Sequence, residues 1–166
     1  MDSAKASDPA AARGDSHTIG PEAHAVIARV MAYPIGAIVD KYISDFHVRP
    51  DLAAEHEREL KRYLALSILN DSSGYGMRGP VDDLWHTFIL FTREYARFCA
   101  ETAGCFIHHT PATDVDQQAT STARDPYDAM LRDYETVFGE SPPGHIWPRG
   151  VDLRIRLSAA RRAESV

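Results

Sequence analysis

The chain has 166 residues and a mass of 18.4 kDa, which is the size of one domain. Its 18 basic and 24 acidic side chains give a net charge of -6, and this balance excludes the clustered positive charge that binding to nucleic acid or anionic lipid requires. Its apolar runs are short and it has only two cysteines, so we expect no membrane span, no disulfide framework and a cytoplasmic protein.

The two ends of the chain differ in composition from its middle. Residues 1–19 contain almost no large apolar side chain, so burial there does not offset the entropy lost on ordering. We therefore predict a disordered leader over residues 1–19, one compact helical domain over residues 20–157 and a frayed tail over residues 158–166.

Five segments of this domain have apolar residues three or four positions apart, the spacing of amphipathic helices. Four of them begin at a proline or one residue before it, and proline is favoured at the first helical position. The Tyr33-Pro34 step separates the first two, because a residue before proline avoids the helical region. The predicted helices cover residues 21–33, 34–46, 50–70, 81–103 and 125–138.

Turn and loop residues lie between these segments. The run NDSSGYGMRGP ends the third helix, Gly104 ends the fourth, and residues 112–124 have no periodicity. Prolines should extend residues 140–148, with Ile146 and Trp147 pinning this segment to the helices. No segment alternates like a strand, so we predict an all-α fold of about five helices with a Pro-rich extended C-terminal segment.

The run EHERE in the third predicted helix contains a histidine among charges. Its Glu55, Arg58 and Glu59 have the spacing of ion pairs on one helix face. We expect this face to be solvated, with His56 on it and without a functional role.

The fourth predicted helix carries the first candidate site residues. At 100° per residue, Asp82 and His86 are neighbours one turn apart and lie off the apolar face. Arg93 and Arg97 are expected on the same polar strip. An acid one turn before a histidine can set its tautomer, raise its basicity or share a cation with it.

Two adjacent histidines, His108 and His109, follow the same helix. Neighbouring side chains on an extended segment point to opposite sides, so at most one is expected to face a given site. Imidazole and carboxylate groups bind divalent iron, copper, nickel and zinc. The sequence therefore predicts a metal pocket of His86 with one or both of these histidines, and Asp82 as co-ligand or orienting partner.

The cysteines indicate other chemistry less strongly. The spacing C-x5-C-x2-H-H of Cys99, Cys105, His108 and His109 departs from the short paired spacing of structural zinc sites. A nucleophilic cysteine with His108 as base is a third interpretation, but it needs an accessible thiol with a lowered pKa.

The run GPVDDLWHTFILFTREYARFC, followed by GCFIHHTP, resembles the bacterial glycine-rich-domain-containing-protein-like family. The similarity extends over about residues 55–148 and includes ELKRYL and FGESPPGHIWP. Some members have a second histidine at the position of Phe88, so the resemblance implies that His86 depends on His108 or His109. The motif residues are Asp82, Trp85, His86, Thr92, Tyr95, Phe98, Cys99, Gly104, Phe106, Ile107, His108 and His109.

Two functions remain open from these residues. A redox-active or Lewis-acidic metal with an open coordination position would support an oxygen-dependent or hydrolytic reaction on a small molecule or peptide. Alternatively, the chain is a non-enzymatic protein-interaction module whose histidines form a structural hydrogen-bond network. The expected partner is accordingly a small molecule or another protein of unknown identity.

Overall fold

The computed structural model describes residues 19–71, 74–110 and 125–149. Within them every regular element is an α-helix, which confirms the predicted all-α class. The predicted leader lies outside the described residues apart from Ile19, and the predicted loop of residues 112–124 and the tail lie wholly outside them. The helices are α1 (Pro21–Ala32), α2 (Gly36–Phe46), α3 (Pro50–Leu69), α4 (Val81–Leu90), α5 (Thr92–Thr102) and α7 (Pro126–Phe138).

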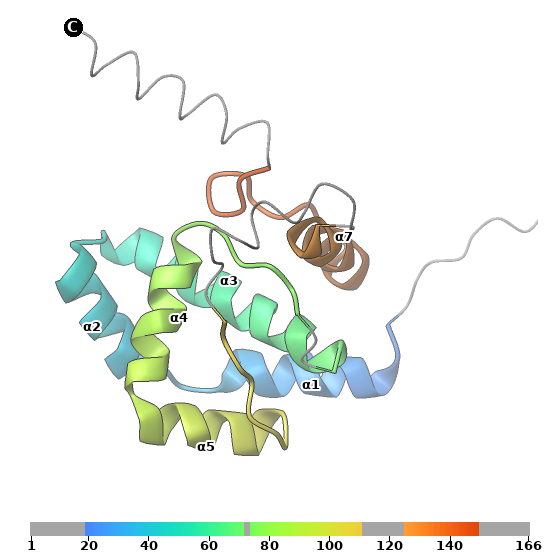
Figure 1. The fold of residues 1–166 in the computed structure, drawn as a ribbon, viewed down its shortest axis with the longest axis horizontal. Helices are drawn as coiled ribbons and strands as arrows, with labels where there is room; N and C mark the ends of the chain where they lie inside the picture. Colours follow the sequence, from blue (N-terminus) through green and yellow to red (C-terminus); the bar gives the residue numbers. More distant parts are fainter. Residues whose placement is uncertain (1–18, 72–73, 111–124, 150–166) are drawn as a thin grey trace, which may run out of the picture.

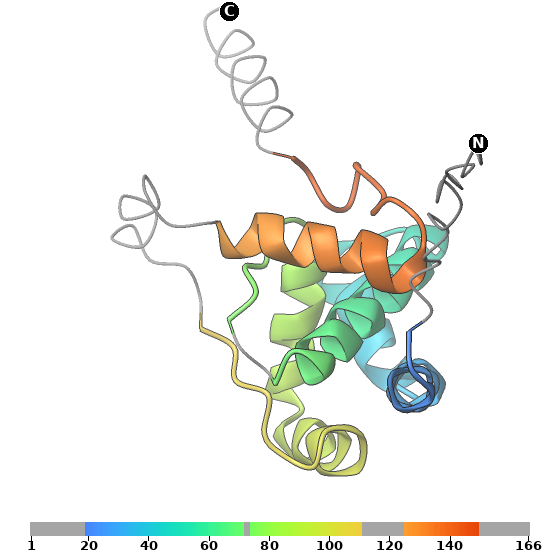
Figure 2. The same cartoon turned by 90° about the vertical axis from the view of Figure 1, so that its right-hand side faces the viewer.

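Helix α3 is the centre of the fold and contacts α1, α2, α4 and α7. It lies between α1 and α7 in Figure 1, and the turned view of Figure 2 shows the same order. Helix α5 contacts α1 and lies beside it at the base of the molecule in Figure 1. Because α3 is covered on several sides, it buries side chains around most of its circumference.

The helix ends follow local sequence signals. Proline occupies the first turn of α1, α3 and α7. The Asp125 carboxylate caps α7 by accepting a 2.9 Å hydrogen bond from the backbone N–H of Tyr127. The helix ends at Gly139, whose φ of 68° is left-handed and is readily adopted only by a residue without a Cβ.

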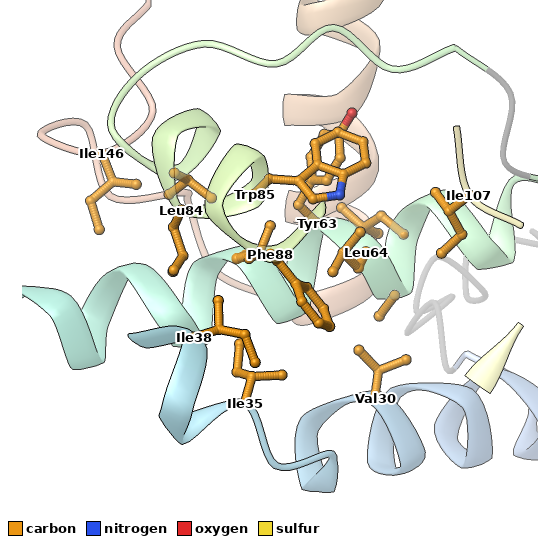
Figure 3. Close-up of a cluster of buried hydrophobic side chains, with 14 of the residues drawn as sticks. Val30, Ile35, Ile38, Tyr63, Leu64, Leu84, Trp85, Phe88, Ile107 and Ile146 are labelled. Carbon is orange, nitrogen blue, oxygen red and sulfur yellow. The ribbon is translucent and has the colours of Figure 1, made fainter. Parts of the chain in front are cut away.

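The core between α3 and α4 is largely aromatic. Figure 3 shows Trp85 and Phe88 pointing from α4 toward Tyr63 and Leu64 of α3, with Ile107 at the edge of the same cluster. All five side chains are 2 % exposed or less. Burying each of them stabilises the fold by about 1.5–3 kcal/mol before the loss of side-chain entropy.

The single helix predicted over residues 81–103 was wrong, because the chain turns at Phe91 between α4 and α5. Phe91 has a ψ of 61°, which is outside the helical range. The turn lets α4 pack on α2 and α3 while α5 packs on α1. The expected polar strip is split as a result, since Arg93 and Arg97 belong to α5, where Arg97 pairs with Glu94 at 3.2 Å.

The connection from α3 to α4 passes close to the C-terminal segment. Gly79 has a φ of +92°, and a Cβ at this position would lie 2.3 Å from the carbonyl oxygen of Ile146. Ile146 and Trp147 are 0 % and 1 % exposed, which confirms that they pin the Pro-rich segment to the helices. Any larger residue at Gly79 would therefore push this segment off the core.

No single helix in the described ranges is both long and apolar enough to cross a membrane. The bent pair of α1 and α2 meets the length and composition criteria only when the two helices are taken together.

Candidate metal centre

The first turns of α4 position two of the site residues. Asp82 and His86 lie one turn apart, with His86 Nδ1 3.8 Å from Asp82 Oδ2. Val81, Leu84 and Trp85 are buried between and beside them, so the helix cannot rotate without exposing its core face. Local helix geometry and burial together therefore set the direction of Asp82 and His86.

The third residue comes from the extended segment after α5. Side chains alternate along it, because Ile107 is buried, His108 is exposed and His109 turns inward again with a side chain only 8 % exposed. The His109 ring lies against the Trp85 indole, with centroids 4.2 Å apart and an angle of 30° between the planes. His109 is thereby held beside the outer face of α4.

These two segments bring three donor atoms together. His109 Nε2 lies 2.8 Å from His86 Nε2 and 3.2 Å from Asp82 Oδ1. Asp82 Oδ1 is buried and accepts no hydrogen bond from the described residues, although the Asp82 side chain as a whole is 34 % exposed. A buried carboxylate oxygen without a hydrogen bond is destabilising by about 1–3 kcal/mol. It is therefore an acceptor that needs a proton or a cation.

The geometry suits a cation as well as a hydrogen bond. Transition metals bind imidazole nitrogen and carboxylate oxygen at about 2.0–2.2 Å. A metal at that distance would form angles of roughly 80–105° between His109 Nε2 and each of its two neighbours, which imidazole and carboxylate ligands of one metal can adopt. Without a cation, one of the two facing imidazole nitrogens must carry the proton and the other must accept it.

His108 lies apart from this group. Its ring is exposed and packs against Phe106, with centroids 5.0 Å apart. Among the described residues, the only set of three histidine, cysteine, aspartate or glutamate side chains with the spacing for a metal is Asp82, His86 and His109. The structure thus brings together three of the four residues that the sequence suggested as ligands and leaves His108 at the surface.

The two cysteines differ in exposure. Cys99 is buried, and burial raises the pKa of its thiol. Cys105 is exposed, in the turn that follows α5. The structure therefore argues against Cys99 as a nucleophile and gives Cys105 accessibility alone.

The expectation that EHERE forms a solvated face was wrong for two of its members. His56 is 3 % exposed, and its Nδ1 lies 2.9 Å from the Tyr42 hydroxyl, which also donates to the Pro80 carbonyl at the start of α4. Burial lowers the pKa of His56. Glu59 is fully buried. Ion-pair spacing alone does not distinguish an outer helix face from one that another segment covers.

Glu59 is the centre of a second polar cluster, which we call the Glu59 cluster. Its Oε2 accepts 2.9 Å hydrogen bonds from the Tyr134 hydroxyl and from Trp147 Nε1. Its Oε1 faces Arg58 Nε at 3.3 Å and an Arg62 nitrogen at 3.4 Å. Every oxygen of this carboxylate therefore has donors, and the cluster joins α3, α7 and the C-terminal segment.

A surface groove lies elsewhere on the described part of the molecule. A groove of about 470 Å³ is lined by residues of α1, the α1–α2 turn and α5, including Arg29, Tyr33 and Arg97, and by none of the three site residues. His86 and Asp82 side chains are 43 % and 34 % exposed, so the candidate metal centre opens to the surface directly. The chemistry of its donor atoms, and not the depth of a cavity, identifies it.

Comparison with known proteins corrects the expected family. The model of the UCP032817-like family matches residues 33–128. Membership in the glycine-rich-domain-containing-protein-like family was wrong, since nothing indicates that family. Five of the twelve motif residues that suggested it are buried packing residues, namely Trp85, Tyr95, Phe98, Cys99 and Ile107. Such residues report a helical core more than a particular family.

No curated protein matches the chain, and no solved structure matches it. The family match spans more than half of the residues and contains all three site residues. The chain therefore belongs to the UCP032817-like family, whose function is uncharacterised.

Proposed function

We propose that the protein binds one divalent transition metal through Asp82, His86 and His109. The observation that carries the proposal is the meeting of Asp82 Oδ1, buried and without a hydrogen bond, with two imidazole nitrogens that face each other. A cation between them would satisfy all three atoms at once. Iron, copper, nickel and zinc all accept this combination of ligands.

The number of ligands favours a reactive centre over a structural one. Structural zinc sites are closed by four protein ligands, whereas catalytic sites keep positions for water or substrate. Three protein ligands at the surface leave such positions free. We propose a metal-dependent enzyme acting on a small molecule or peptide, in the cytoplasm, where cysteines outside disulfides, such as Cys99, are common.

The competing function is a protein-interaction module without a metal. It is favoured by the 2.8 Å separation of His86 Nε2 and His109 Nε2, which is also the length of a direct hydrogen bond. In that case the two rings and Asp82 would be a structural network. The two functions differ in the effect of each histidine on metal content.

The deciding experiment is elemental analysis of the untagged full chain, stripped with chelator and reloaded separately with Fe²⁺, Cu²⁺, Ni²⁺ and Zn²⁺. We expect close to one tightly bound metal in the parent and almost none in His86→Ala or His109→Ala. His108→Ala is the matched control, because this exposed histidine is next in sequence to His109 but points away from the site, and it should keep the metal.

Two results would reject the metal centre. The first is a folded parent protein that retains no metal after reloading. The second is a parent whose metal is lost equally in His108→Ala and His86→Ala, which would indicate weak binding to surface histidines in general. Either result would direct the search toward protein partners.

A further inference from the structure

We propose that Tyr95 is a positioning residue for the candidate metal centre and that its hydroxyl sets the distance between His86 and His109. The inference rests on the proposed function, because it assigns a role in building the same site. Tyr95 contacts no metal ligand through a hydrogen bond. It binds Trp85, which directly precedes His86, and Ile107, which lies two residues before His109.

The hydroxyl of Tyr95 joins the two segments that carry the histidines. It accepts a 3.1 Å hydrogen bond from Trp85 Nε1, and Trp85 directly precedes His86. It donates a 2.6 Å hydrogen bond to the carbonyl of Ile107, two residues before His109. One buried oxygen atom thus connects α4 to the extended segment after α5.

The extended segment depends on such side-chain bonds. No backbone–backbone hydrogen bond joins residues 106–109 to the rest of the described chain. The carbonyl of Ile107 accepts a hydrogen bond from the Tyr95 hydroxyl on α5, and the Cys99 side chain, one helical turn later, lies near the Ile107 backbone N–H. Ile107 is therefore held on α5 through its carbonyl, and the register of His109 follows from this bond.

The indole of Trp85 links the Tyr95 hydroxyl to the imidazole ring of His109. Its N–H is directed at Tyr95, and its face lies 4.2 Å from the His109 ring. The Tyr63 ring packs against the indole at 5.3 Å. The orientation of Trp85, which the Tyr95 hydroxyl helps to set, therefore determines where the His109 ring lies. Groups that orient ligands in this way typically change metal affinity by 10–100-fold when they are removed.

Tyr95→Phe is the direct test, because it keeps the buried ring, with its edge contacts to Phe88 and Phe106, and removes only the oxygen. Using Co²⁺ as a spectroscopic probe, we expect affinity to fall roughly 10–100-fold and the visible absorption spectrum of the bound ion to change. Cys99→Ala keeps the Tyr95–Ile107 bond and removes only the thiol near the Ile107 N–H, so it should weaken binding to a smaller degree.

Two tyrosine variants control for loss of stability. Tyr134→Phe removes a buried hydroxyl from the Glu59 cluster, so it should lower the melting temperature but leave the affinity and spectrum of Co²⁺ unchanged. Tyr127→Phe removes a buried hydroxyl that has no hydrogen-bond partner among the described residues. It should change neither the melting temperature nor the binding of Co²⁺. Equal weakening of Co²⁺ binding in Tyr95→Phe and Tyr134→Phe would overturn the inference.

A second readout needs no metal. In the metal-free protein, we expect nuclear Overhauser contacts between the ring protons of His86 and His109 in the parent and in Tyr134→Phe, and their loss in Tyr95→Phe. If the parent binds no Co²⁺, the proposed function fails, and this measurement alone decides the role of Tyr95. Retention of the ring contacts in Tyr95→Phe would show that the hydroxyl does not position His109.

Discussion

The Glu59 cluster and the candidate metal centre are both built around a carboxylate, but the two carboxylates differ in how fully they are hydrogen-bonded. Glu59 is fully buried, and donors from a tyrosine, a tryptophan and two arginines reach its two oxygens. Asp82 is partly exposed, yet one of its oxygens is buried without a hydrogen bond beside two imidazoles. The described residues supply donors to both oxygens in the first arrangement, whereas in the second they leave Asp82 Oδ1 without a hydrogen bond.

This difference indicates what each cluster is for. A buried charge whose donors are all supplied by the chain holds segments together, here α3, α7 and the C-terminal segment. A set of donor atoms that the chain leaves incomplete at the surface destabilises the fold slightly and is typical of a binding site. We therefore expect the Glu59 cluster to govern stability and the metal centre to govern binding.

The largest effect is expected at Glu59. Glu59→Ala leaves Trp147 Nε1, the Tyr134 hydroxyl and Arg62 without their acceptor in the interior. Breaking such a buried pair lowers the free energy of unfolding by about 3–5 kcal/mol. Urea unfolding would measure it. The folded fraction should still take up metal like the parent, and a variant of parental stability would show that the cluster is not structural.

The two histidines of the metal centre should differ in their effect on stability. His109→Ala removes a mostly buried ring from Trp85 and should lower the free energy of unfolding by about 1–3 kcal/mol. His86→Ala removes a ring that is 43 % exposed and should change it by less than about 1 kcal/mol. Both should abolish metal binding in equilibrium dialysis. If the two variants lost metal binding only in proportion to their loss of unfolding free energy, the metal centre would not differ in role from the Glu59 cluster.

His56 should make stability depend on pH. Burial lowers its pKa, and Glu55 and Asp83 oppose this effect while His145 adds to it. The unfolded chain therefore binds a proton more readily than the folded one, so stability is complete above the ordinary histidine pKa of about 6.5 and falls as the pH drops toward the lowered value.

The loss through this one group cannot exceed about 1.4 kcal/mol for each pH unit. Urea unfolding at a series of pH values would measure it, with His56→Asn as the variant that removes the ionisation. His24→Asn is the matched control, because His24 is exposed on α1 and is not among the groups that shift the pKa of His56. An unchanged pH slope in His56→Asn would assign the effect to other groups.

Asp82→Asn should have the smallest effect on stability and a large effect on binding. The substitution keeps the shape of the side chain and removes the charge from an oxygen that accepts no hydrogen bond. We expect the free energy of unfolding of the metal-free protein to stay within about 1 kcal/mol of the parent or to rise. Metal affinity should fall. A large loss of stability without metal would mean that Asp82 is a structural partner like Glu59.

Much of the fold was predictable because its signals are local. Apolar spacing and prolines located α1, α2, α3 and α7 to within about two residues. The turn at Phe91 was missed because neither glycine nor proline marks it, and it arises from the packing of α4 and α5 on different helices. Propensity and periodicity within one segment carry no information about such a change of direction.

The candidate site also has one part that local sequence predicts and one part that tertiary contacts determine. The neighbouring positions of Asp82 and His86 follow from the pitch of an α-helix, so the sequence by itself determined that they share a face. Only the tertiary structure decided that His109 and not His108 meets them, because the hydrogen bond of the Ile107 carbonyl to Tyr95 of α5 sets the register of that segment.

The burial of Glu59 was likewise decided by the tertiary structure, since its partner Trp147 is 88 positions away in the chain. Backbone geometry relates residues within a turn or two, whereas contacts between distant segments depend on how the whole set of helices buries its apolar faces.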